Sequence, residues 1–134
     1  MSSIVDFIGL DKAVKKPDKK GYIFDSMRKK YVCHQPEEVV RQQVVRYLVE
    51  ELAYPRALIT LEECIVYGGL KKRVDIMIRA RKTASPLMLI ECKAWHYGIK
   101  QEHLNQLTMY NSVMQAPFIV LTNGVHQLLS LIHI

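Results

Sequence analysis

The stretch from Pro86 to Ala94, PLMLIECKA, constrains the fold most, because it is apolar on both faces up to its first charged residue, Glu91. A strand of this kind must be covered on both sides, as at the centre of an α/β sheet. The run then meets Glu91, Cys92 and Lys93. A lone carboxylate or ammonium is costly to bury there, so we expect these charges to be paired or bound to a metal.

Helical and strand-like patterns follow one another in the order α-β-β-β-α-β, which predicts an α/β fold. Pro36 begins a helix that ends before Tyr54, strands are expected over residues 58–67, 71–81, 86–94 and 117–122, and a second helix over 99–115. Within 71–81, alternation predicts that Val74, Ile76, Ile78 and Ala80 face one side and that Arg73, Asp75, Met77, Arg79 and Arg81 face the other. The inward faces of the helices are predicted to carry Val40, Val44, Val45, Leu48 and Leu52, and Leu104, Leu107, Tyr110 and Met114.

A chain of 134 residues is the size of one domain, with a net charge of +6. Residues 1–35 carry eight Lys and Arg against four Asp, which is +4 of that charge. They are interpreted as a basic arm with a loop over 15–21 and a short hairpin, either a solubilising segment or one that touches nucleic acid. Residues 36–124 form the predicted core. Residues 125–134 are either one more strand or helix, or the start of a segment that continues past residue 134.

Several classes are excluded. No apolar run reaches the roughly 18 residues of a membrane helix, and the N-terminus lacks a secretory signal, so we expect a cytoplasmic protein without a membrane partner. Cys33, Cys64 and Cys92 offer neither a disulfide framework nor a zinc knuckle, and are expected to be reduced thiols. No phosphate-binding GxxxxGK[ST] loop is present, so ATP is not expected as a partner.

Asp75 interrupts one predicted strand as Glu91 ends the next, and Lys93 shares the face of Glu91. Two acids and an ammonium from adjacent strands suit metal-assisted phosphodiester hydrolysis, because hard carboxylate oxygens bind Mg²⁺ and the Lys can position the nucleophile or stabilise the developing charge. The structural alternative is that Glu91 and Lys93 pair with each other while Asp75 pairs with an Arg. Three features favour the catalytic reading: the apolar strand before Glu91, the acid on the preceding strand, and a helix with acids before both.

Asp75, some fifteen further residues and then Glu91-Cys92-Lys93, within this order of elements, resemble the PD-(D/E)XK nucleases. More narrowly, the chain is similar to the N-terminal nuclease domain of type I restriction enzyme R subunits and small stand-alone relatives. The likeness spans about residues 22–126 and rests on the segments IFDSMRKKYV, PEEVVRQQVVRYLVEELAYP, KKRVDIMI, PLMLIECKA, QLTMY and PFIVLTNG. It implies a restriction-endonuclease-like core with a mixed central sheet flanked by helices.

The resemblance also implies residue roles. Asp75 and Glu91 match the metal-binding carboxylates, with the carbonyl of Cys92 as a third ligand, and Lys93 matches the catalytic lysine. The acid of the first helix falls at Glu38, or at Glu37 if the helix is rotated. Gln106 and Tyr110 match a QxxxY element that faces the site and holds the substrate strand or the lysine.

Together these matches predict a Mg²⁺-dependent DNA endonuclease domain, with Mn²⁺ able to substitute. Any sequence specificity would come from a partner subunit or an attached domain, because no element of the chain evidently reads bases. RNA is an alternative substrate, and a non-catalytic nucleic-acid-binding or assembly module of the same fold is the alternative function. Three departures from the family pattern are Val74 in place of Pro, the lack of a helicase motor in this chain, and the segment after Gly124, which does not look like the family's continuation.

Overall fold

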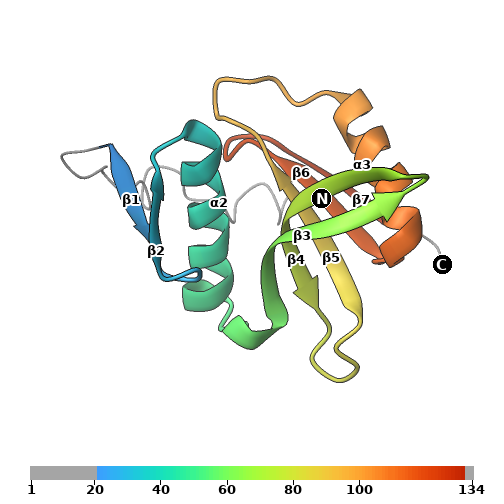
Figure 1. The fold of residues 1–134 in the computed structure, drawn as a ribbon, viewed down its shortest axis with the longest axis horizontal. Coiled ribbons are helices and arrows are strands. Elements are labelled where there is room, and N and C mark those ends of the chain that lie inside the picture. The colour runs from blue at the N-terminus through green and yellow to red at the C-terminus, as the bar shows by residue number, and fades with distance from the viewer. Residues whose placement is uncertain (1–20, 132–134) are drawn as a thin grey trace.

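The structure, a computed structural model, describes residues 21–131 (Figure 1). Its elements are β1 (Tyr22–Asp25), β2 (Lys30–Cys33), α2 (Pro36–Arg46), β3 (Ile59–Tyr67), β4 (Leu70–Arg79), β5 (Pro86–Cys92), α3 (Gln101–Met114), β6 (Phe118–Thr122) and β7 (Gln127–Leu131). A π-helical turn, Tyr47–Glu51, continues α2, and a 3-10 turn, Arg56–Leu58, leads into β3. The predicted order α-β-β-β-α-β is therefore confirmed for residues 36–122.

The central sheet has five strands in the order β3-β4-β5-β6-β7. Strands β5 and β6 are parallel, and the other neighbours are antiparallel. Helix α3 lies in the connection between the parallel pair, as a parallel connection requires. This is the predicted α/β class, a mixed sheet flanked by helices, and it agrees with a restriction-endonuclease-like core.

The two helices cover opposite faces of the sheet, and each face has its own apolar core (Figure 1). The core under α2 consists of Val40, Val44, Val45, Leu48, Ile59, Ile76, Ile78, Ile90, Cys92 and Val120. The core under α3 consists of Ile65, Val74, Met77, Leu89, Leu104, Leu107, Tyr110, Ala116, Ile119 and Leu121. Strand β5 contributes Ile90 to the first and Leu89 to the second, so the prediction of a central strand covered on both sides is confirmed.

Two predictions about which residues face the core are wrong. Leu52 is 50% exposed, because the helical turns end at Glu51 and leave it outside the apolar stripe. Val74 packs under α3 together with Met77, whereas Ile76 packs under α2. Strict alternation places Val74 with Ile76 and opposite Met77, so the alternation of β4 breaks between residues 74 and 76.

The segments at either end of the core also have structure. Strands β1 and β2 form an antiparallel hairpin, paired from Tyr22↔Cys33 to Asp25↔Lys30. Strand β7 pairs antiparallel with β6, so residues 127–131 form one more strand, one of the two readings open from sequence. The predicted loop over residues 15–20 lies outside the described residues, as do the rest of the arm before residue 21 and residues 132–134.

Two further sequence predictions concern membranes and cysteines. Over residues 21–131, every helix is too short or too polar to cross a bilayer. All three cysteines are free thiols; Cys92 is buried, while Cys33 and Cys64 are exposed. Burial raises the pKa of the Cys92 thiol well above its usual value, and the neighbouring carboxylates raise it further, so this thiol stays protonated.

Candidate active site

Asp75 lies at a break in the ladder between β3 and β4. The two strands keep one register on both sides of it, but the pair between Glu62 and Asp75 is missing. Glu62 has a φ of 57°, in the left-handed region that a residue with a Cβ rarely adopts inside a strand. Ile76 packs towards α2 and Val74 towards α3, so the pleat changes face across this point. The break therefore takes Asp75 out of the regular alternation.

Asp75 and Glu91 meet where β4 and β5 part. The pairing of these strands at this end stops at Ile76↔Ile90, and one further step would set Asp75 opposite Glu91. The backbone N–H of Cys92 donates to Asp75 Oδ2 at 2.7 Å, which ties the carboxylate to the end of β5. The Glu91 side chain is 9% exposed and the Asp75 side chain 26% exposed. The predicted meeting of the two acids is therefore present.

The environment of Asp75, including the charge of Glu91, changes its proton affinity. Burial raises the pKa of Asp75 to about 7, and the negative charge of Glu91 and a side-chain hydrogen bond with it act in the same direction. The N–H of Cys92 and the charge of Arg41 oppose this rise in the pKa. At neutral pH the two carboxyl groups therefore tend to share a proton, unless a cation supplies positive charge in its place.

The cation paired with Glu91 is Lys72, from β4. Lys72 Nζ lies 2.5 Å from Glu91 Oε2, and both side chains are largely buried. Lys93 follows β5 directly, is half-buried, and is held through its backbone N–H, which donates to the Thr122 carbonyl at 2.8 Å. The alternative in which Glu91 pairs with Lys93 is therefore replaced by a pair with Lys72.

Glu38, not Glu37, is the acid of α2 that turns inward. Glu38 is 6% exposed, whereas Glu37 is exposed. Glu38 Oε1 accepts from Arg28 and its Oε2 from Arg41. Arg41 Nη1 also lies 3.9 Å from Asp75 Oδ1, so Glu38 is linked to Asp75 through this arginine.

A cleft of about 310 Å³ opens beside these groups, between the hairpin, α2 and the break in the sheet. Its lining combines charged residues with part of β2: Arg28, Val32, Cys33, Gln35, Glu37, Glu38, Arg41, Glu62 and Asp75. Tyr110 of α3 is 5% exposed in the core, edge to face with Tyr67, and Gln106 is exposed one turn earlier. The substrate role that the family likeness implies for Gln106 and Tyr110 stays a prediction.

The arginines predicted on the face of Asp75 do not all lie at the site. Arg79 pairs with Glu63 at 3.8 Å and donates to the Ala84 carbonyl. Arg81 stacks on the ring of Tyr54, 4.7 Å from its centroid. Both arginines therefore have partners within the protein, and the expectation that they face phosphates stays a prediction.

Asp75 and Glu91 offer carboxylate oxygens that suit a hard divalent cation, but two side chains alone do not complete its coordination shell. The negative charge of Glu91 raises the pKa of Asp75, so a cation between the two carboxylates would relieve their repulsion, and Mg²⁺ prefers such oxygen ligands. Within residues 21–131, however, no three Asp, Glu, His or Cys side chains come together as a metal site. The Asp75–Glu91 pair would therefore hold an ion with backbone oxygen and water as the remaining ligands, the usual habit of Mg²⁺.

Three residues of this region were missed from the sequence: Arg28, Glu62 and Lys72. Strict alternation puts Lys72 on the face opposite Asp75, and only the break in β4 brings it to Glu91. Glu62 gives no signal, because an acidic residue inside a strand is ordinarily a solvent-facing one. Arg28 falls in a basic cluster of the sequence, which hides that it is only 18% exposed and fully paired.

The fold and the site define a mixed α/β domain in which two strand carboxylates meet at the opening of the sheet. The chain belongs to the family of the type I restriction enzyme R protein N terminus, whose model matches residues 36–133. This confirms the narrower of the two likenesses inferred from the sequence. Because the match continues to residue 133, the expectation that the segment after Gly124 departs from the family is wrong. A search of curated proteins finds no match.

Proposed function

We propose that this domain is a Mg²⁺-dependent DNA endonuclease of the PD-(D/E)XK superfamily. The observation that carries the proposal is the meeting of Asp75 and Glu91 where β4 and β5 part, with Cys92 N–H bonded to Asp75 and Lys93 next in the chain. Membership of a restriction-enzyme domain family supports the same reading.

In this proposal Asp75 and Glu91 hold the ion, together with the Cys92 carbonyl that the family likeness implies. The chemistry that bound Mg²⁺ supplies is a lower pKa for water and neutralisation of charge on the scissile phosphate. Lys93 positions the attacking water or stabilises the charge that develops on the phosphate oxygens. Glu38 orients water or a second ion, and Gln106 and Tyr110 hold the substrate strand or Lys93.

The proposed substrate is DNA held through its backbone, with RNA as the alternative. The net charge of +6 favours a polyanion but carries no sequence information. Recognition of a sequence is therefore assigned to a partner subunit or an attached domain, and no role for ATP is proposed.

One observation favours the alternative, a nucleic-acid-binding or assembly module without catalysis. Lys72 already neutralises Glu91 at 2.5 Å, so the site can satisfy part of its charge without a metal. Nuclease function requires Glu91 to exchange this ammonium for the ion, or to bind both through its two oxygens.

The test is nicking of supercoiled plasmid and of single-stranded DNA and RNA by the full chain, with Mg²⁺, Mn²⁺ or EDTA. Wild type should cut with either metal and not with EDTA, and Asp75→Asn and Lys93→Ala should each lose about 100-fold or more. Glu50→Gln and Lys82→Ala, exposed and remote from the site, serve as controls that should keep full activity. Cutting that survives both site substitutions contradicts the assignment, and binding without cutting under every condition supports the alternative module.

A further inference from the structure

Arg28, in the turn between β1 and β2, closes a ring of ion pairs beside Asp75. Its Nη2 binds Glu38 of α2, and its Nη1 lies 3.1 Å from Glu62 of β3. Arg41 binds the same two carboxylates, Glu38 through Nη2 and Glu62 through Nη1 at 3.5 Å. Arg28, Glu38, Arg41 and Glu62 therefore alternate in charge around a closed ring that joins the hairpin, α2 and the sheet.

The ring differs from ordinary surface ion pairs in its burial. The side chains of Glu38 and Arg41 are 7% and 10% exposed and that of Arg28 is 18% exposed, while Glu62, at 38%, is the exposed member of the ring. Exposed pairs are worth little because water and side-chain entropy offset them, whereas a buried and mutually paired network fixes its members in one arrangement. The two positive and two negative groups also make the ring neutral overall, which lowers the cost of burying its members.

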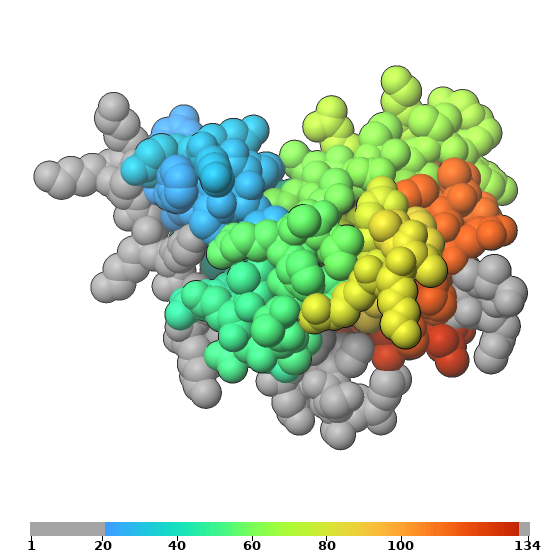
Figure 2. Space-filling view, turned by 90° about the horizontal axis from the view of Figure 1, so that it is seen from below, coloured from blue at the N-terminus to red at the C-terminus, as the bar shows by residue number. Residues whose placement is uncertain are grey.

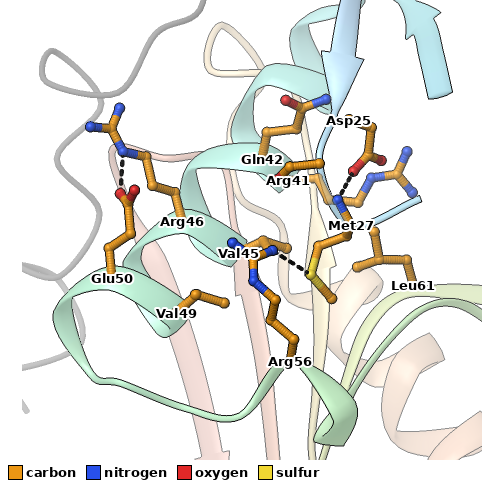
Figure 3. Close-up of a pocket in the computed structure, with 11 residues that line it drawn as sticks. Asp25, Met27, Arg41, Gln42, Val45, Arg46, Val49, Glu50, Arg56 and Leu61 are labelled. Carbon is orange, nitrogen blue, oxygen red and sulfur yellow. Dashed lines mark hydrogen bonds and ion pairs between the residues drawn. The ribbon is translucent and has the colours of Figure 1, made fainter. Parts of the chain in front are cut away.

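Hydrogen bonds within the hairpin turn fix the orientation of the Arg28 side chain. Asp25 Oδ1 accepts the N–H of Met27 at 2.9 Å and that of Arg28 at 3.2 Å, while Asp25 Oδ2 accepts Arg28 Nε at 2.5 Å. Arg56 contacts Met27 Sδ at 3.2 Å on the other side of the turn, where a second pocket separates the turn from α2 (Figure 3). Among the described residues, the hairpin lies at one end, next to α2 (Figure 1 and Figure 2).

The ring reaches the site by two routes. Arg41 Nη1, which binds Glu62, also lies 3.9 Å from Asp75 Oδ1. Glu62 itself is the residue whose left-handed backbone opens the ladder opposite Asp75. Backbone conformations of this kind persist where the surroundings hold them, and bulges often re-aim a side chain near a site. Both arginines bind the Glu62 carboxylate and so hold this conformation.

We propose that Arg28 and Glu62 are positioning residues of the nuclease site, which act on Asp75 through Arg41 and through the break in β3. The proposal rests on the proposed function and extends it. The hairpin lies before residue 36, where the family match begins. The role of Arg28 makes the hairpin part of the active site.

The test compares plasmid nicking by full-length wild type, Arg28→Met, Arg28→Lys, Glu62→Gln and the double variant Arg28→Met/Glu62→Gln. Each single neutral variant should lower kcat by about 10- to 100-fold with the KM for DNA unchanged, the range seen when partners that orient metal ligands are lost. Arg28→Lys should restore only part of kcat, because one ammonium cannot replace a planar guanidinium that binds three carboxylates. The double variant should lose no more than the worse single variant, because either substitution already opens the ring.

Arg46→Met is the matched control and should keep full kcat. Arg46 is on α2, as Arg41 is, but its ion pair with Glu50 is exposed, at 49% and 56%. If Arg28→Met does not fold by circular dichroism, Glu62→Gln decides, because its side chain is 38% exposed. If wild type cuts DNA and Arg28→Met and Glu62→Gln cut equally well, or show only a raised KM, this proposal is overturned and the proposed function stands. Wild type that never cuts overturns both.

Discussion

At the residue scale, Asp75 is a carboxyl group placed where its negative charge is costly. Burial and the neighbouring Glu91 raise its pKa to about 7, and one backbone N–H and Arg41, 3.9 Å away, only partly offset this. Sites that bind or react often carry such destabilising arrangements, and substitutions that relieve them stabilise the protein while removing function. Asp25 is the opposite case, because burial raises its pKa but hydrogen bonds from Arg28 and Met27 outweigh this and lower it.

These two carboxyl groups give opposite pH dependences in metal-free protein. Asp75 binds protons more tightly when folded, so its contribution to the free energy of unfolding is present below about pH 4 and is lost as pH rises towards 7. Asp75→Asn should therefore stabilise the protein at pH 8 by about 2–4 kcal/mol relative to wild type, and the difference should vanish near pH 4. Urea unfolding in EDTA at several pH values measures it.

Asp25→Asn is the matched comparison. Its lowered pKa contributes stability at neutral pH that is lost as pH falls through the folded-state pKa, so this variant should be less stable at pH 7, by about 1–2 kcal/mol. A stabilising Asp25→Asn, or an Asp75→Asn that weakens the protein at pH 8, would show that the two environments are misassigned.

The sequence identifies the acids of the site but not their partners. Asp75, Glu91 and Lys93 stand out because charge at the end of an apolar strand needs a physical reason. Arg28, Glu62 and Lys72 do not stand out, because a lysine or glutamate in a strand and an arginine in a basic turn have an ordinary solvent-facing reading. Their contacts depend on how distant elements meet, which no local pattern contains.

At the element scale, the helices and strands follow from periodicity, whereas the break does not. Alternation in β4 places Ile76 correctly and Val74 incorrectly, because the left-handed Glu62 on the partner strand interrupts the ladder between them. That interruption is a tertiary feature supported by charges from α2 and the hairpin. The period of a strand therefore predicts its faces only as far as the first bulge or break.

Helix α3 also ends on a left-handed residue, and this one is a structural cap. Gln115 has a φ of 57° and follows the last turn, while Asn111 bonds both the N–H and the carbonyl of Ala116. Gly adopts this conformation without strain, so Gln115→Gly should raise the free energy of unfolding by about 0.5–1 kcal/mol.

Thermal unfolding monitored by circular dichroism measures this change. Asn105→Gly, at an exposed position inside the same helix, is the control and should instead lower stability by about 0.5–1 kcal/mol. Equal destabilisation by both glycines would mean that residue 115 is not a left-handed cap in solution.

At the scale of the whole molecule, the site lies where three units meet: the sheet, α2 and the N-terminal hairpin. Helices on both faces bury the middle of β5, so charge emerges only at its end, next to the break in β3 and β4. The cleft beside Asp75 is lined by residues of all three units. The order of elements and the two-sided core are predictable from sequence, but the docking of the hairpin onto α2 through Arg28 is not.

Titration of the full chain with Mn²⁺ tests most directly whether Asp75 and Glu91 together bind one divalent ion. Calorimetry at pH 8 should give one site per chain in wild type and in Lys93→Ala, which keeps both carboxylates. Asp75→Asn and Glu91→Gln should each weaken binding by about 10-fold or more, and Glu50→Gln, whose exposed carboxylate pairs with Arg46, should not. Binding that is absent from wild type, or equally strong in Asp75→Asn, would contradict the account.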